Sequence, residues 1–134
     1  MKKNLFATIR QLGSMTIFFT LTAGETWWPE LLQYLKKILY KGKITIIDAI
    51  NLSDHEKTSL IQQDPITCAR YFANKIAKFM PVLKSVFEPY RVNELFYRRE
   101  FQNRGSPHIH GTYVCSTLTG VHKVRIRVRT FWTF

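Results

Sequence analysis

The longest helix that the sequence predicts stands between segments with strand character, and this order constrains the fold more than any other feature. Asp64-Pro65 is a strong start signal for the helix. Apolar residues then recur at helical spacing, namely Ile66, Ala69, Phe72 or Ala73, Ile76, and Phe79 or Met80. We expect Pro81 to kink or end the helix, and Pro89 closes the segment.

Segments on both sides of this helix are typical of β-strands. Residues 16–22 are β-branched and aromatic and are bounded by Gly13 and Gly24, so they predict a buried strand. Residues 92–102 alternate imperfectly between polar and apolar, and residues 108–116 follow as a second strand. Because only about five residues separate these two segments, we expect them to form an antiparallel hairpin.

Shorter helices complete the predicted order. Residues 3–12 carry apolar residues at helical spacing, and Gly13 can end that helix. Thr26 can cap the next helix, with Pro29 in its first turn and Gly42 at its end. The apolar stripe of this second helix consists of Leu31, Leu32, Leu35 and Leu39.

The region before the long helix is less clear. Residues 44–51 are predicted either as a short strand or as a loop. Ser53 and Glu56 form a capping box, which opens a short helix to about Gln63. Helices combined with an antiparallel sheet give an α+β class, with the helices packed on the sheet. The sequence contains no internal repeat and no low-complexity linker, so we expect a single domain.

The charge balance points to a polyanionic partner. The 20 Lys and Arg residues against 9 Asp and Glu residues give a net charge of +11, which favours DNA, RNA or an anionic membrane. The longest apolar stretch, residues 15–21, is far shorter than the roughly 20 residues of a spanning helix, so a membrane partner is not expected. Two cysteines, Cys68 and Cys115, do not form a disulfide framework and are expected in the core of a reduced, intracellular protein.

His108 and His110 are the most informative residues. On a strand, side chains two residues apart share a face, so the two imidazoles are expected side by side, where they can ligate a metal. Ile109 should point the other way, into the core. Pro107 fixes the chain entering the strand, and the missing side chain of Gly111 should let a bulky ligand approach.

Glu100 and Gln102 share one face of the neighbouring strand. Either could supply an oxygen ligand across the hairpin, and Glu100 is preferred because a divalent cation favours a charged ligand. The alternative stays open that the two histidines serve only packing or lie on the surface.

Four segments resemble Helitron replication initiators, which belong to the HUH endonuclease superfamily. They are 5–13 (LFATIRQLG), 18–25 (FFTLTAGE), 64–72 (DPITCARYF) and 96–111 (FYRREFQNRGSPHIHG). The resemblance implies a domain over residues 4–116, with the histidines on a central strand and helices behind the sheet. Residues 117–134 then form a divergent basic tail.

The resemblance also implies a chemistry. In this superfamily the histidine pair and a polar residue hold Mg²⁺ or Mn²⁺, which polarises the scissile phosphate of single-stranded DNA. Imidazole ligands favour Mn²⁺. A tyrosine hydroxyl then attacks and forms a covalent phosphotyrosine. No small-molecule cofactor is expected, and the family implies a nuclear location, although the chain carries no clear targeting signal.

The expected nucleophile is missing from the sequence. The resemblance places paired tyrosines downstream of the histidines, but no Tyr-x-x-x-Tyr occurs and no tyrosine follows Tyr113. The phosphate-binding loop of a helicase is absent as well. We therefore expect a C-terminally incomplete HUH-like domain that is inactive alone. Tyr71 is the one substitute considered, because Lys75 one helical turn later could lower the pKa of its phenol; otherwise Tyr71 belongs near the core.

Further DNA contacts are expected around the hairpin and near the second helix. Arginines can contact phosphates, and the candidates are Arg98, Arg99 and Arg104. Trp27 and Trp28 could stack on bases, although one of them is expected in the core. Residues 123–129 alternate strictly between cationic and aliphatic, which predicts either an edge strand with a basic face or a segment without a role.

Three functions remain open from the sequence. The preferred one is a metal-binding fragment of a nicking enzyme. The second is a degenerate or domesticated module that binds single-stranded DNA without catalysis. The third is a hydrolase that uses the metal to activate water and forms no covalent adduct.

Overall fold

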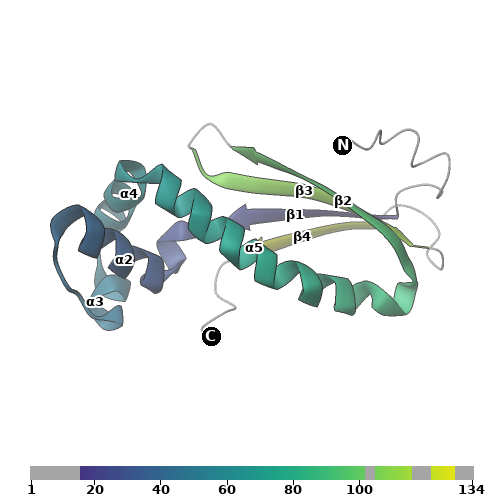
Figure 1. Ribbon diagram of the computed structural model, residues 1–134, viewed down its shortest axis with the longest axis horizontal. Coiled ribbons are helices and arrows are strands. Elements are labelled where there is room, and N and C mark those ends of the chain that lie inside the picture. Colours follow the sequence, from purple (N-terminus) through teal and green to yellow (C-terminus); the bar gives the residue numbers. More distant parts are fainter. Residues whose placement is uncertain (1–15, 102–104, 116–121, 129–134) are drawn as a thin grey trace.

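A four-stranded sheet forms the centre of the computed structural model, which describes residues 16–101 and 105–115 and the backbone of residues 122–128 (Figure 1). The strands are β1 (Ile17–Ala23), β2 (Val92–Phe101), β3 (Pro107–Cys115) and β4 (His122–Val128). Their order in the sheet is β2-β3-β1-β4. β3 runs antiparallel to β1 and β2, whereas β4 runs parallel to β1.

The α+β class, the first strand and the β2–β3 hairpin are confirmed. Of the two interpretations left open for residues 123–129, the edge strand is confirmed for the backbone of β4, which pairs along β1 from Ile17 opposite His122 to Ala23 opposite Val128. The helix expected over residues 3–12 lies outside the described residues. None of the described helices combines the length and hydrophobicity that a membrane crossing needs.

The helices gather on one side of the sheet and at one end of it. They are the 3₁₀ turn η1 (Glu25–Trp27), α2 (Pro29–Tyr40), α3 (Ile46–Asn51), α4 (Asp54–Gln63), α5 (Pro65–Phe87) and the 3₁₀ turn η2 (Glu88–Tyr90). Figure 1 shows α5 running along the sheet, with α2, α3 and α4 clustered beyond one end of the strands.

The hydrophobic core lies between the sheet and these helices. Alternate residues of β1 point into it, and these are Ile17, Phe19 and Leu21. β3 adds Ile109 and Tyr113, and Trp28 adds its ring just before α2. The helices add Leu31, Leu32, Leu35, Phe72 and Ile76. Cys68 and Cys115 are buried free thiols of this core, as predicted.

The start of α2 differs from the prediction. Trp28 occupies the cap position without a side-chain cap hydrogen bond, and Thr26 lies inside η1, so the predicted Thr26 cap is wrong. Pro29 at the first helical position sets the start, because its φ is already helical and it has no N–H to satisfy. The helix ends at Tyr40, and its C-cap is Lys41, whose φ of 52° is left-handed, instead of the predicted Gly42.

Residues 44–51 contain a helix, so the prediction of a strand or loop is wrong. A capping box opens α3: the Thr45 hydroxyl accepts from the Asp48 backbone N–H, and the Asp48 carboxylate accepts from the Thr45 N–H. The predicted box of Ser53 and Glu56 is confirmed at the start of α4.

α5 begins as predicted but is longer. The Asp64 carboxylate accepts a hydrogen bond of 3.0 Å from the Thr67 backbone N–H and caps the first turn. Pro81 does not end the helix, which continues to Phe87. Pro81 is exposed, whereas Leu83 is buried and Phe87 packs against the core, so packing of the last turns outweighs the hydrogen bond that proline removes.

Candidate metal centre

Two imidazoles lie next to each other on β3. The ring centroids of His108 and His110 are 4.4 Å apart, and the ring planes meet at 68°. His108 is nearly buried, while the His110 side chain is 39% exposed. Ile109 between them is fully buried in the core. The prediction that the histidines share one face and Ile109 the other is therefore confirmed.

The strand on one side of β3 supplies a hydroxyl. Thr22 of β1 is the register partner of His108, and its Oγ1 lies 2.9 Å from His108 Nδ1. The sequence analysis missed this residue. Thr20 and Thr22 alternate with buried Phe19 and Leu21, which places both hydroxyls on the histidine face, but only the strand register shows which one meets an imidazole.

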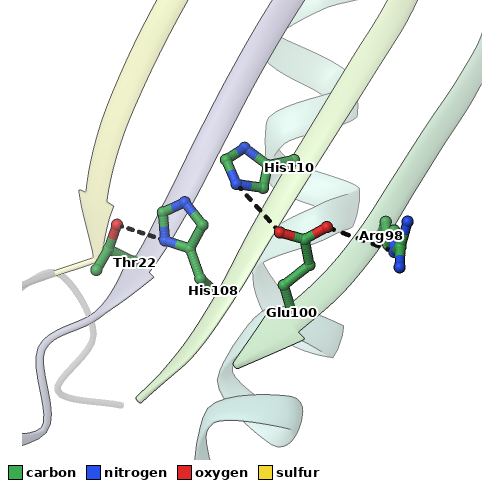
Figure 2. A network of polar contacts seen from close by, with 5 residues as sticks. All are labelled: Thr22, Arg98, Glu100, His108 and His110. Carbon is green, nitrogen blue, oxygen red and sulfur yellow. Dashed lines mark hydrogen bonds and ion pairs between the residues drawn. The ribbon is translucent and has the colours of Figure 1, made fainter. Parts of the chain in front are cut away.

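The strand on the other side supplies a carboxylate. Glu100 of β2 is the register partner of His108, and its Oε2 lies 3.7 Å from His110 Nε2. Its Oε1 lies 3.4 Å from Nε of Arg98. Glu100 therefore reaches across the hairpin to His110, while its role as a metal ligand stays a prediction. Figure 2 shows the resulting line of side chains across three strands, here called the polar row: Thr22, His108, His110, Glu100 and Arg98.

The donor set of the polar row suits a divalent cation. Two imidazole nitrogens and a carboxylate oxygen are a ligand combination that Mn²⁺ accepts, and Mg²⁺ accepts the oxygen more readily than the nitrogens. Within the described residues, however, no three His, Cys, Asp or Glu side chains converge as a ready-made metal group. The third predicted ligand, Gln102, lies outside the described residues, as does the predicted phosphate contact Arg104.

Gly111 does not open space for a ligand, so that prediction is wrong. Gly111 faces the core, where Phe19 is its register partner. A Cβ on Gly111 would lie 2.1 Å from Cζ of the Phe19 ring. The absent side chain therefore makes room for a core aromatic ring, on the opposite face from the histidines.

Comparison with known families identifies the chain. The family described as the Helitron helicase-like domain at the N-terminus matches residues 1–113. The chain belongs to this family. No curated protein and no solved structure matches the chain. The family match includes β1, β2 and the histidines of β3, whereas β4 lies beyond it.

The two hairpin arginines of this Helitron helicase-like domain lie on opposite faces of β2. Arg98 is opposite His110 in the register, whereas Arg99 is opposite the buried Ile109. Both side chains are exposed. Because register partners share a face, Arg98 alone of the two belongs to the histidine face.

The two tryptophans are also separated. Trp27 is 56% exposed, so its ring is accessible to a base. Trp28 is only 2% exposed and packs against Tyr71 and Phe72, with centroid distances of 5.5 and 6.4 Å. Trp28 is a core residue of the Helitron helicase-like domain, as expected for one of the two tryptophans, so of this pair Trp27 alone remains a candidate for base stacking.

Tyr71 is poorly suited to act as a nucleophile. The Lys75 ammonium lies 5.3 Å from the Tyr71 ring centroid, over the ring. Burial, with a smaller effect of Glu30, raises the pKa of Tyr71 to about 12, so the predicted lowering by Lys75 is wrong. Tyr71 also packs with the helical core, on the opposite side of the sheet from the histidines.

Proposed function

We propose that the polar row of this Helitron helicase-like domain binds a divalent cation, with Mn²⁺ favoured over Mg²⁺, and a phosphate of single-stranded DNA. The observation that carries the proposal is the histidine pair with ring centroids 4.4 Å apart and a carboxylate oxygen 3.7 Å from one of the rings. The family supports a place in a Helitron transposon-related protein. The resemblance of the family to HUH endonucleases supports DNA strand nicking as the activity of its members.

Each residue of the polar row has a role in this proposal. His108 and His110 would supply imidazole nitrogens to the cation, and Glu100 would supply a carboxylate oxygen. The bound cation would polarise a phosphoryl oxygen of the scissile phosphate. Arg98 would contact a phosphate of the same DNA strand, since its side chain belongs to the histidine face and is 83% exposed.

The charge of the chain supports a nucleic-acid partner. The net charge is +11, and part of it is carried by β4. Arg125 and Arg127 are the backbone register partners of Thr20 and Thr22 on β1. In the backbone register, these basic positions therefore continue the line of positions that contains the histidines, which supports a nucleic-acid partner.

We do not propose that this chain cleaves DNA by itself. All six tyrosines lie within the described residues, and none belongs to the polar row; they are Tyr34, Tyr40, Tyr71, Tyr90, Tyr97 and Tyr113. We propose cation and DNA binding without strand cleavage by this chain. We also propose a nuclear location, which imaging of a tagged chain would test.

Calorimetric titration with Mn²⁺ tests the metal site. The wild-type chain should bind with a dissociation constant in the micromolar range, and the variant with His108→Ala and His110→Ala should lose the binding. His55→Ala is a matched control, because His55 is exposed on α4 and outside the polar row. No Mn²⁺ binding by a wild-type chain that circular dichroism shows to be folded would overturn the proposal.

A second assay separates this function from the alternatives. Binding of a fluorescent single-stranded oligonucleotide should weaken when EDTA removes the cation. Binding that is unchanged by EDTA would favour a DNA-binding module without a metal. Multiple turnover of DNA cleavage without a covalent protein–DNA adduct would instead identify a metal-dependent hydrolase.

A further inference from the structure

We infer that the outer edge of β2 pairs antiparallel with β2 of a second copy of this chain, so that the two sheets join into one. β2 lies at one end of the strand order β2-β3-β1-β4, and its ladder is with β3. Among the described residues, no strand pairs with its other edge. Backbone N–H and C=O groups along such an edge are a template for another strand. The inference does not rest on the metal and DNA binding proposed above.

The edge of β2 is long and regular. The strand has ten residues, Val92–Phe101. Its ladder with β3 shifts register between Val92 and Glu94, at the start of the strand, and runs without a shift from Leu95 to Phe101. The side chains of Tyr97 and Phe101 are 53% and 62% exposed, although both lie on the face of β2 that carries the core farther along. This part of β2 is therefore accessible to another chain.

The charge of β2 is balanced, although the whole chain carries +11. Two glutamates stand against two arginines in this strand, namely Glu94 and Glu100 against Arg98 and Arg99. The cationic positions of β4 lie at the opposite edge of the sheet. Two copies that meet at β2 therefore bring neutral edges together and keep their basic β4 strands apart.

Two-fold symmetry restricts the register of such a pair. One residue faces its own copy across the axis, and residues at equal distances on either side of it face each other. With Phe96 at the axis, Glu94 of each copy faces Arg98 of the other, which gives two pairs of opposite charge. On the opposite face of the strand, Leu95 then faces Tyr97, so each exposed tyrosine ring gains an apolar neighbour.

Other positions of the axis are less favourable. With the axis at Tyr97, Glu94 faces Glu100 of the other copy, and with the axis at Arg98 or Arg99 that arginine faces itself. Like charges directly opposite each other destabilise a strand pair. A shift in the other direction brings the irregular start of the strand into the middle of the pairing. The charge pattern of β2 therefore selects Phe96 as the centre.

Contacts within one chain are compatible with this pairing. Arg98 Nε lies 3.4 Å from Glu100 Oε1, and the Arg98 side chain is 83% exposed. A guanidinium has five N–H donors, so further donors can reach a carboxylate across the edge. The carboxylate of Glu94 has two acceptor oxygens and can accept from the second copy in addition to its interactions within the chain.

The dimer presents both polar rows on one side. Register partners in an antiparallel pair share a face, so the histidine faces of the two copies lie on the same face of the joined sheet. If each polar row binds DNA as proposed, the dimer offers two DNA sites on one surface. This consequence alone rests on the proposed function.

Sedimentation equilibrium of charge-reversal variants tests the pairing in the absence of metal and DNA. The wild type should approach twice the 15.8 kDa mass of one chain as its concentration rises. Arg98→Glu and Glu94→Arg each bring two pairs of like charge together, so each should weaken dimerisation about 10-fold or more. Arg99→Glu is the matched control, because it changes the charge equally but lies opposite the uncharged Asn93 of the other copy.

A mixture of the two weakened variants tests the register itself. Arg98→Glu and Glu94→Arg chains face each other with two pairs of opposite charge, so they should form a heterodimer about as stable as the wild-type dimer. Native mass spectrometry identifies it by mass, and circular dichroism shows that each variant is folded. The inference would be overturned by a wild type that stays monomeric, by equal weakening in Arg98→Glu and Arg99→Glu, or by folded variants that form no heterodimer. None of these outcomes decides whether the polar row binds Mn²⁺, which calorimetry tests separately.

Discussion

The ring of Phe19 lies over the bare Cα of Gly111, its partner across the ladder between β1 and β3. Three atoms of the ring would lie 2.1 to 2.7 Å from a Cβ at this position. Phe19 is fully buried, and the Tyr113 ring lies 5.4 Å away, centroid to centroid. Gly111 directly follows His110, so the requirement for glycine at the end of the histidine motif comes from packing on the other face of the strand.

Gly111→Ala should therefore destabilise the fold strongly. The added methyl group must displace the fully buried ring of Phe19, and overpacking of this kind costs about 2 to 3 kcal/mol. Urea unfolding followed by circular dichroism measures the loss. Gly42→Ala is the control, because a Cβ there would meet only Lys36 Cγ at 4.0 Å. A Gly111→Ala chain as stable as Gly42→Ala would contradict the packing of Phe19.

Removal of the Tyr113 hydroxyl should stabilise the protein. Tyr113 is fully buried, and within the described part of the chain its hydroxyl oxygen has no hydrogen-bond partner. An unsatisfied buried polar group is unfavourable, so we expect Tyr113→Phe to increase the free energy of unfolding by about 1 kcal/mol. Tyr97→Phe, at a residue that is 53% exposed, should leave it unchanged. A loss of stability in Tyr113→Phe would show that the hydroxyl has a partner.

The two faces of β2 should differ in DNA binding. Arg98→Gln removes a cation from the histidine face, so single-stranded DNA should bind more weakly. The slope of log affinity against log salt concentration should become shallower by about 0.7, the value for one phosphate contact on a single strand. Arg99→Gln, which changes the same residue type on the opposite face, should have no effect. Equal effects of the two variants would place the DNA elsewhere.

Acid should destabilise the helical region through its capping residues. The carboxylates of Asp48, Glu56 and Asp64 accept hydrogen bonds from Thr45, Ser53 and Thr67, respectively. These bonds, first those from the side chains and second those from the backbone, lower the pKa values of the three carboxyl groups. Their ordinary pKa values are 3.8, 4.5 and 3.8. Because the folded pKa values are lowered, this stabilisation is complete above the ordinary values and is lost as the pH falls through the folded ones.

Urea midpoints measured from about pH 7 down to about pH 3 should stay level at first and then decline below about pH 5. In a variant with Asp48→Asn, Glu56→Gln and Asp64→Asn, midpoints should be lower at neutral pH and the acid decline should be shallower. An equally steep decline in this variant would assign the acid sensitivity to other carboxyl groups.

Local signals in the sequence predicted much of this fold. The capping box of Ser53 and the pair Asp64-Pro65 fixed two helix starts, because a cap depends on residues within one turn. The prediction that the two histidines share one face was equally local, because it depends only on the alternation of side chains around Ile109. Thr45 and Asp48 also form a capping box, with Asp at the position that Glu usually occupies. This local pattern indicates the start of α3.

Long-range relationships could not be predicted in this way. The end of α5 depends on Leu83 and Phe87 packing against the core, not on the local effect of Pro81. The contact between Thr22 and His108 depends on the register of β1 against β3, which no local pattern fixes. Similarly, Gly111 had no side chain to indicate a face, and only the pairing with Phe19 shows that it belongs to the core.

The position of β1 also determines when the domain can fold during synthesis. β1 leaves the ribosome first among the described strands, but both of its neighbours in the sheet, β3 and β4, leave last. The Thr16 hydroxyl, for example, donates a hydrogen bond to the carbonyl oxygen of Tyr113, which is 97 positions later. The intervening helices carry their own caps and can form on local timescales, while both edges of β1 wait for partners. Closure of the sheet must therefore be a late and comparatively slow event. A nascent chain halted before residue 107 would expose the unpaired backbone edges of β1 to chaperones, proteases and other nascent chains.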